Sequence, residues 1–187
     1  RAPRVAGGRR DVRLEVSIQV RAQPEAPTLK YAFAPLKHAR LDYMVQKAVE
    51  IGAGVLSPVI TRYTQVSRVN SDRMAANAVE AAEQCGLLSL PRVAEPRPLA
   101  QWLDALPAER VLVFCDEAAA DHDPIHALRT APDGPVSVLI GPEGGFSPDE
   151  RALIAPRAVT LSLGPRILRA DTAAVDALAL VGAARGG

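Results

Sequence analysis

Two glycine-rich turns near the C-terminus constrain this chain of 187 residues more than any other feature. One is Gly-Pro-Glu-Gly-Gly at residues 141–145, and the other is Leu-Gly-Pro-Arg-Ile-Leu-Arg at residues 163–169. Each follows a short apolar run and precedes a helical pattern. Ligands of α/β proteins bind at such places, beyond the carboxyl ends of the strands. Neither turn has the spacing of a Rossmann or P-loop phosphate motif, so the pair predicts a different nucleoside-like ligand, held largely by backbone.

The first turn connects a predicted strand to a predicted helix. Residues 136–140 are rich in β-branched side chains, as in a buried strand. A helix start follows, with Ser147 as N-cap, Pro148 at the first helical position and Glu150 completing a capping box. A merely tight connection needs one or two glycines, whereas this turn has three around a carboxylate. The composition therefore favours a binding loop.

The second turn follows a strand-like run at residues 159–163. It leads to a segment ending near residue 181 that is apolar on nearly all sides, which predicts a buried helix capped by Asp171 or Thr172. Within the turn, Arg166 and Arg169 bracket an Ile-Leu pair. The apolar pair is suited to an adenine slot, and an arginine can reach a phosphate or a polar base edge. Alternatively, one arginine pairs with a nearby carboxylate.

The rest of the chain alternates between predicted strands and helices, which indicates a parallel α/β sheet. Strands are expected at residues 29–33, 55–60 and 111–116, and helices at 38–51, 71–85 and 124–129, with proline-rich turns around Trp102. Residues 12–20 alternate cleanly between apolar and polar, which predicts a half-buried antiparallel strand. A proline-containing linker ends at residue 27, so we expect an N-terminal part over 1–27 and a main domain over 28–187.

Composition limits how the chain can bind other molecules. Hydrophobic residues make up 48%, which excludes a disordered protein, and the net charge of +1 excludes a uniformly basic RNA-binding body. Any basic surface must be local. Five arginines near the N-terminus form such a cluster, which either contacts phosphate or is simply solvated: Arg1, Arg4, Arg9, Arg10 and Arg13.

Other sequence features predict a cytoplasmic protein without a metal or a membrane span. No apolar run is long enough to cross a bilayer, and no signal-peptide pattern opens the chain. Cys85 and Cys115 are far apart, as expected of reduced structural thiols. His122 and His126 are four residues apart, but the Asp123-Pro124 helix start leaves His122 outside the helix that would align them.

The two turns, taken with two upstream segments, resemble a known family. Residues 140–147 and 163–173 are similar to the C-terminal motifs of the RsmE-type RNA methyltransferases of the SPOUT superfamily, and residues 44–53 and 81–91 resemble earlier family segments. Two positions depart from the family pattern. Asp171 stands where glutamate is usual, and Leu87 stands near the place of a usual arginine.

The resemblance implies a fold and a reaction. The fold would be a SPOUT-type parallel sheet with a C-terminal deep trefoil knot, preceded over residues 1–27 by the end of a small PUA-like β-barrel. The reaction would be methylation of N3 of a uridine in 16S, small-subunit ribosomal RNA, with S-adenosylmethionine as methyl donor. Family members are homodimers with the site near the subunit interface, which makes ribosomal RNA and a second copy of the chain the expected partners.

The resemblance also assigns candidate site residues. The donor is expected to lie against the 114–117 turn and both glycine turns, at Leu139, Ile140, Gly141, Glu143, Gly144, Gly145, Leu163, Gly164, Ile167, Leu168 and Thr172. Arg169, and after it Arg166, would stabilise the anion that develops on uracil. Glu143 or Asp171 would accept a proton or orient an arginine.

Two other functions remain open. One is a SPOUT enzyme that acts on another RNA, such as a ribose 2′-hydroxyl of transfer RNA. The other is a non-catalytic RNA-binding assembly factor that keeps the fold. The intact glycines and both arginines favour an enzyme.

Overall fold

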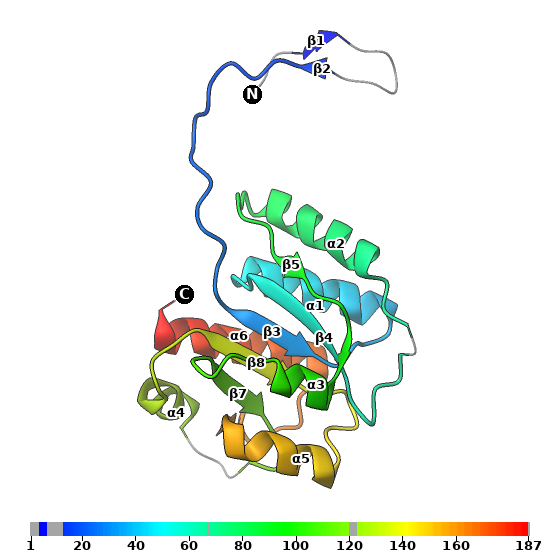
Figure 1. The fold of residues 1–187 in the computed structure, drawn as a ribbon, viewed down its shortest axis with the longest axis vertical. Helices are drawn as coiled ribbons and strands as arrows, with labels where there is room; N and C mark the ends of the chain where they lie inside the picture. Colours follow the sequence, from blue (N-terminus) through cyan, green and yellow to red (C-terminus); the bar gives the residue numbers. More distant parts are fainter. Residues whose placement is uncertain (1–3, 7–12, 67, 120–122, 187) are drawn as a thin grey trace.

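A parallel β-sheet forms the centre of the molecule (Figure 1). The computed structural model describes residues 4–6, 13–66, 68–119 and 123–186. Strands of the sheet run in the order β5-β4-β3-β8-β7-β9, with β6 beside β4, and each of these pairings is parallel. Their bounds are Lys30–Phe33 (β3), Val55–Ile60 (β4), Arg92–Val93 (β5), Arg97–Pro98 (β6), Val111–Cys115 (β7), Val136–Ile140 (β8) and Ala158–Leu161 (β9). This confirms the parallel α/β architecture predicted from the sequence.

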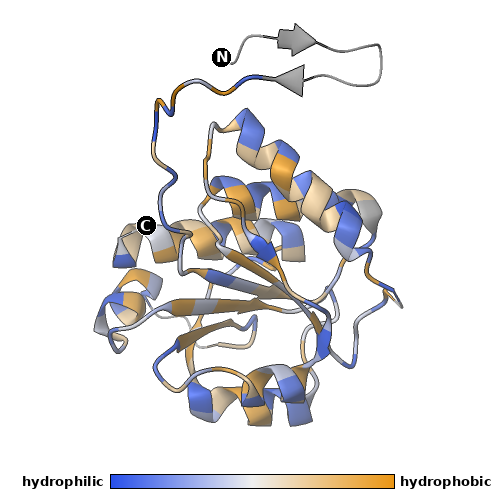
Figure 2. Ribbon diagram, turned by 45° about the horizontal axis from the view of Figure 1, so that its top comes forward, coloured by the Kyte–Doolittle hydropathy of each residue, from blue (hydrophilic) through white to orange (hydrophobic). Residues whose placement is uncertain are grey.

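Helices cover both faces of the sheet. The α-helices are His38–Glu50 (α1), Ser71–Gln84 (α2), Leu99–Asp104 (α3), Pro124–Thr130 (α4), Pro148–Ile154 (α5) and Ala170–Arg185 (α6), and a 3₁₀ turn spans Ala155–Arg157. One apolar cluster joins the sheet to α1, α2, α4 and α6, and a second joins it to α3 and α5. Figure 2 shows the apolar colouring of the central strands between these layers.

Strand β3 shows why the central strands are apolar without alternation. Tyr31 and Phe33 point into the first cluster and Ala32 into the second, and all three are fully buried. A strand covered on both faces needs apolar side chains at every position. β8 lies directly beside β3, so both strands end at the same edge of the sheet as β7 and β9. The two glycine turns leave the sheet at this edge.

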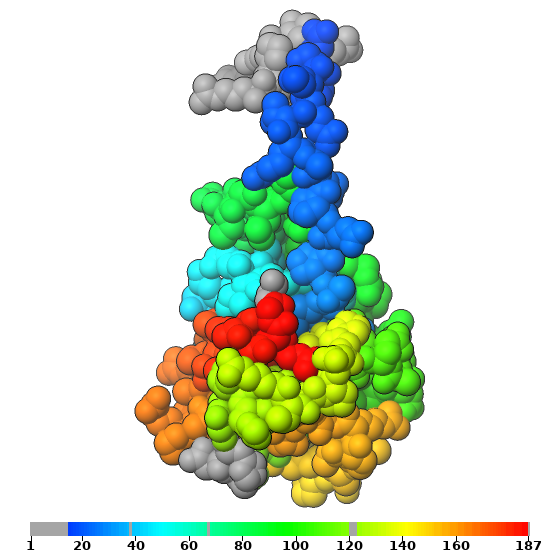
Figure 3. Space-filling model, turned by 90° about the vertical axis from the view of Figure 1, so that its left-hand side faces the viewer, coloured from blue at the N-terminus to red at the C-terminus, as the bar shows by residue number. Residues whose placement is uncertain are grey.

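The end of α6 is tied to α4. Figure 3 shows the C-terminal segment lying against the α4 region. The Arg185 guanidinium donates hydrogen bonds to the backbone oxygens of Leu128 at 3.2 Å, Ala131 at 3.0 Å and Pro132 at 2.7 Å. A cation placed at these carbonyls stabilises the α4 C-terminus.

Most predicted helices and strands are confirmed to within two residues. Trp102 lies in α3, a short helix that the flanking prolines concealed in the sequence. The predicted caps of α6 are wrong, because Arg169 is the N-cap, and Asp171 and Thr172 lie in the first turn. The Asp171 carboxylate instead accepts a 3.1 Å hydrogen bond from the Thr172 backbone N–H.

The predicted strand over residues 12–20 is also wrong for most of its length. Only Arg13–Leu14 (β2) is a strand, paired antiparallel with Arg4–Ala6 (β1), and Val12 lies outside the described residues. Val16, Ile18 and Val20 are 79%, 73% and 84% exposed. An alternating pattern forms a stable strand only when another layer covers its apolar side. No described part of this chain covers it.

Candidate functional site

The loops that follow β7, β8 and β9 surround one cavity of about 250 Å³. Both glycine turns line it, as does the turn after β7 at Cys115, Asp116 and Glu117. Eight of the predicted donor-binding residues are brought together here: Ile140, Gly141, Glu143, Gly145, Leu163, Gly164, Ile167 and Leu168. Arg166 lines the same cavity. Most of the predicted site residues are therefore brought together at the carboxyl edge of the sheet.

The other predicted residues lie around the cavity but do not line it. Leu139 is fully buried in the core that α3 and α5 cover. Gly144 lies against Tyr63, and Thr172 lies in the first turn of α6. Arg169 is the N-cap of α6, at the end of the second glycine turn.

The first glycine turn is shaped by close packing as well as by backbone conformation. A Cβ atom at Gly141 would lie 2.6 Å from the Phe146 ring, so any larger residue would displace that ring. Phe146 packs edge-on against Phe114, with ring centroids 5.1 Å apart. Gly145 has φ +66°, a conformation that side-chain-bearing residues rarely adopt. Both glycines therefore fix the wall of the cavity.

Arg151 of α5 joins two loops of the site. Its guanidinium pairs with Asp116 and lies 3.7 Å from Glu117 Oε1, and its Nε donates to the backbone oxygen of Phe146 at 3.2 Å. The capping box predicted at Ser147 and Glu150 is present and holds the start of α5. Sequence reasoning missed Arg151 and Asp116 as a pair, because only folding brings residues 35 positions apart together.

The charged residues of the turns have different environments. Glu143 Oε1 lies 3.3 Å from Arg40 Nη1 of α1, and each side chain is 42% exposed. Arg166 and Arg169 are exposed. Across the described residues, neither of these two arginines makes an ion pair or a side-chain hydrogen bond. The alternative that one of them braces the turn by pairing with Glu143 or Asp171 is therefore not what the structure shows.

Burial keeps the protons of Cys115 and Tyr31 in place, at the end of β7 and within β3. Burial raises the pKa of the Cys115 thiol to about 12, and burial also raises the pKa of Tyr31 well above its usual range. The Tyr31 hydroxyl lies 2.8 Å from the sulfur of Met44. A neutral thiol is a poor nucleophile and a poor metal ligand. Cys115 therefore contributes packing.

The described residues contain no cluster of three or more histidine, cysteine, aspartate or glutamate side chains with metal-binding geometry. His122 lies outside this part of the chain, and Asp123 caps α4 as predicted. No helix in the described ranges is both long and apolar enough to cross a bilayer.

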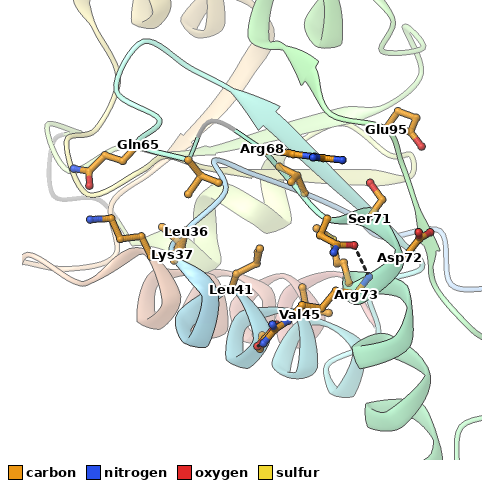
Figure 4. Close-up of a pocket in the computed structure, with 15 residues that line it drawn as sticks. Leu36, Lys37, Leu41, Val45, Gln65, Arg68, Ser71, Asp72, Arg73 and Glu95 are labelled. Atoms are coloured by element: carbon orange, nitrogen blue, oxygen red, sulfur yellow. Dashed lines mark hydrogen bonds and ion pairs between the residues drawn. The ribbon is translucent and has the colours of Figure 1, made fainter.

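A second, larger cleft of about 920 Å³ lies between α1, α2 and the loop after β4 (Figure 4). Lys37 and Gln65 lie at one end of it, and Arg68 extends over it. Arg73 pairs with Asp42 at 2.5 Å. The loop that carries Gln65 also carries Tyr63, which reaches the first glycine turn.

Comparison with known proteins agrees with this geometry. Residues 24–182 match the family model of the RNA methyltransferase domain. The chain is 30% identical over 173 residues to ribosomal RNA small subunit methyltransferase E of Rickettsia conorii, covering 89% of this chain and 70% of the relative. This chain belongs to that family.

Solved structures of the family have the same fold. The Neisseria gonorrhoeae ribosomal RNA small subunit methyltransferase E, bound to S-adenosylmethionine, superposes with a TM-score of 0.74 at 26% identity, covering 84% of this chain and 66% of that one. A Legionella pneumophila methyltransferase with the same cofactor superposes with a TM-score of 0.74 at 29% identity, covering 92% of this chain and 72% of that one. The parallel-sheet fold is thus that of the SPOUT methyltransferases. The chain spans between 56% and 70% of the length of its relatives from Rickettsia, Buchnera and Synechocystis.

The two departures from the family pattern lie outside the cavity lining. Leu87 lies three residues beyond Gln84, the last residue of α2, is 38% exposed, and donates its backbone N–H to the Ala82 oxygen at 2.8 Å. Asp171 keeps its negative charge in the first turn of α6, where the helix dipole favours a carboxylate.

Proposed function

We propose that this protein methylates N3 of a uridine in small-subunit ribosomal RNA, using S-adenosylmethionine as methyl donor. The observation that carries the proposal is the meeting of both glycine turns in one cavity, in a chain that belongs to this methyltransferase family. The Neisseria and Legionella relatives hold S-adenosylmethionine, which supports the choice of donor.

The residues around the cavity fit this donor. Ile140, Leu163 and Leu168 provide apolar surface for an adenine ring, and the glycines leave backbone groups accessible. Carboxylates of Glu117 and Glu143 can accept hydrogen bonds from hydroxyl or ammonium groups. When bound, S-adenosylmethionine would supply a methyl group carried on a positively charged sulfur.

The two arginines of the second turn are suited to the uracil. N3 of uridine is a weak nucleophile while it carries its proton, so removal of that proton leaves negative charge on the ring. An exposed guanidinium at Arg169 or Arg166 can stabilise that charge. Glu143, which Arg40 contacts, would accept the proton or orient an arginine.

The test begins with small ribosomal subunits from a strain that lacks the gene. Wild-type protein with S-adenosylmethionine should add one methyl group, and mass spectrometry of nuclease digests should locate it on N3 of a uridine. A methyl group on a ribose hydroxyl, or on transfer RNA only, would favour the alternative SPOUT enzyme. Donor binding without methylation of any RNA would favour an assembly factor. Calorimetry with a chelator present should leave donor binding unchanged, since we propose no metal.

Several structural features belong to the same proposal. We infer that the segment over 162–169 takes the chain from β9 at the sheet edge back to α6 through a trefoil knot. We also infer that the protein works in the cytoplasm as a homodimer. α6 packs against α1 and β8 although β9 lies outside β7, which supports such a crossing. Analytical ultracentrifugation should show a dimer. If the chain is knotted, a variant whose two ends are joined by an engineered disulfide should be more compact in denaturant than the same variant after reduction.

The N-terminal part is proposed to be the end of a PUA-like β-barrel that helps to bind RNA. The antiparallel β1–β2 pair, which is separate from the parallel sheet, supports this assignment. The arginine cluster belongs to this part, and its side chains lie outside the described residues. A version with the complete barrel should bind RNA more tightly and with a steeper salt dependence than this chain.

A further inference from the structure

Tyr63 stands beside the first glycine turn on a loop that the reaction described above does not use. The loop runs from the end of β4 toward α2, and Tyr63 is 43% exposed although it is aromatic. Its Cβ lies 3.2 Å and its ring Cγ 3.5 Å from the place where a Cβ of Gly144 would be. The near edge of the side chain therefore rests on the glycine turn, while much of it stays open to solvent.

The loop holds Tyr63 in place. The Thr64 hydroxyl accepts a 2.9 Å hydrogen bond from the Thr61 backbone N–H, and the Thr64 N–H donates to the Thr61 oxygen at 3.2 Å. Glu150 Oε1 accepts a 2.8 Å bond from the Arg62 N–H, and its Oε2 accepts a 2.9 Å bond from the Ser147 N–H. One carboxylate thus ties the Tyr63 loop and the first glycine turn to the same helix start.

Cationic side chains lie next to Tyr63 in the loop and line the neighbouring cleft. Arg62 and Tyr63 border a shallow hollow together with Gly144, and Gln65 belongs both to this hollow and to the larger cleft of Figure 4. Lys37 and Arg68 line that cleft. Within the ranges that the structure describes, no carboxylate forms an ion pair with Arg62, Lys37 or Arg68. Their charges are available to an anionic partner.

An open aromatic ring beside such cations matches the chemistry of single-stranded RNA. Unpaired bases stack on aromatic side chains, and arginines and lysines follow the phosphates. We infer that Tyr63 is a stacking platform for an unpaired RNA base next to the methyl-transfer cavity, and that Arg62, Lys37 and Arg68 hold the adjoining phosphates. The inference rests on the proposed function and adds the surface that holds the RNA strand.

The alternative is that Tyr63 only supports the glycine turn. Two substitutions separate these roles. Tyr63→Phe keeps the ring, whereas Tyr63→Leu keeps apolar bulk at the glycine turn but removes the aromatic face. The matched control is Tyr43→Leu, because Tyr43 is 46% exposed on α1 and lines neither the cavity nor the cleft.

Binding is measured first with a fluorescein-labelled ten-nucleotide oligouridine, and donor affinity by calorimetry. Tyr63→Leu should weaken binding of the oligonucleotide by roughly tenfold or more, as loss of one stacked base does. Tyr63→Phe should stay within about threefold of wild type, and so should Tyr43→Leu. Donor affinity should remain within about twofold in all three. A fall in donor affinity that matches the fall in RNA affinity would overturn the inference, as would equal RNA binding by Tyr63→Leu and wild type.

Methylation of small subunits gives the second readout. Tyr63→Leu should raise KM for the subunits more than it lowers the rate at saturation. Failure of wild-type protein to methylate any RNA would refute the proposed function alone, because the oligonucleotide assay still decides the role of Tyr63. Normal methylation by wild type together with unchanged KM in Tyr63→Leu would refute the stacking role alone.

Discussion

Arg40 Nη1 lies 3.3 Å from Glu143 Oε1, and this contact connects the start of α1 to the first glycine turn. The two residues are 103 positions apart in the sequence. Both side chains are 42% exposed, so the pair contributes at most about 1 kcal/mol to folding stability. The main effect of the ion pair is to hold the Glu143 carboxylate in position at the cavity.

This geometry predicts that Arg40 and Glu143 act as a unit. Arg40→Ala and Glu143→Gln should each lower the single-turnover methylation rate about tenfold, roughly 1.4 kcal/mol. The double variant should be no slower than the slower single variant, since the same interaction is lost in all three. Thermal unfolding should change little. Additive losses in the double variant would show that the two side chains act independently.

Arg169 is predicted to serve methyl transfer more than donor binding. It is exposed at the start of α6, does not line the cavity, and makes no ion pair with another described residue. Arg169→Ala should keep donor affinity within a few-fold but lower single-turnover methylation at least a hundredfold, about 3 kcal/mol. Arg166→Ala is the comparison, because Arg166 does line the cavity. A parallel loss of donor binding and rate in Arg169→Ala would assign it to the donor instead.

Gly141 is predicted to be intolerant of even one methyl group. Gly141→Ala would place a Cβ 2.6 Å from the Phe146 ring, so both thermal stability and donor affinity should fall. Gly182→Ala is the matched control, because Gly182 lies in α6 with no neighbouring atom within 4 Å of the added carbon. That variant should gain up to about 1 kcal/mol from helix propensity. Scanning calorimetry and donor titration measure both effects.

Stability should decrease in alkaline solution. The native Cys115 thiol keeps its proton up to a pKa of about 12, whereas the unfolded thiol loses it near the ordinary value of 9.0. The unfolded state therefore binds fewer protons in this window, and the free energy of unfolding falls as pH rises from about 9 toward 12. Tyr31, whose pKa is also raised, acts in the same direction.

Guanidinium titrations at pH 8, 9 and 10 measure this decrease. In Cys115→Ala, the free energy of unfolding should fall less steeply with pH than in wild type. The contribution of Tyr31 to this fall should remain. Cys85→Ala is the control for loss of a thiol, because Cys85 is exposed. If the free energy of unfolding fell equally with pH in Cys115→Ala and wild type, the Cys115 thiol would not be a cause of the alkaline loss of stability.

Local patterns in the sequence determined most of the secondary structure and the position of both glycine turns after their strands. The apolar run at residues 136–140 and the capping signals at Ser147 and Asp123 depend only on neighbouring residues, and all three are present in the structure. The strand expected over residues 12–20 failed, because alternation says nothing about whether another layer covers the apolar side. The N-cap of α6 is Arg169 and makes no side-chain cap hydrogen bond, so no capping signal in the sequence marks this helix start.

The tertiary structure alone decided which distant residues meet. Arg40 with Glu143, Arg151 with Asp116, and Tyr63 with Gly144 are contacts between loops and helices that no spacing in the sequence reveals. The strand order β3-β8-β7-β9 creates them, because it brings the ends of strands that are far apart in the chain to one edge. The sequence by itself determined that two glycine turns leave the same edge of a parallel sheet. The fold determined which charges and which aromatic ring surround it, because side-chain contacts across a sheet depend on strand order and local sequence patterns do not encode that order.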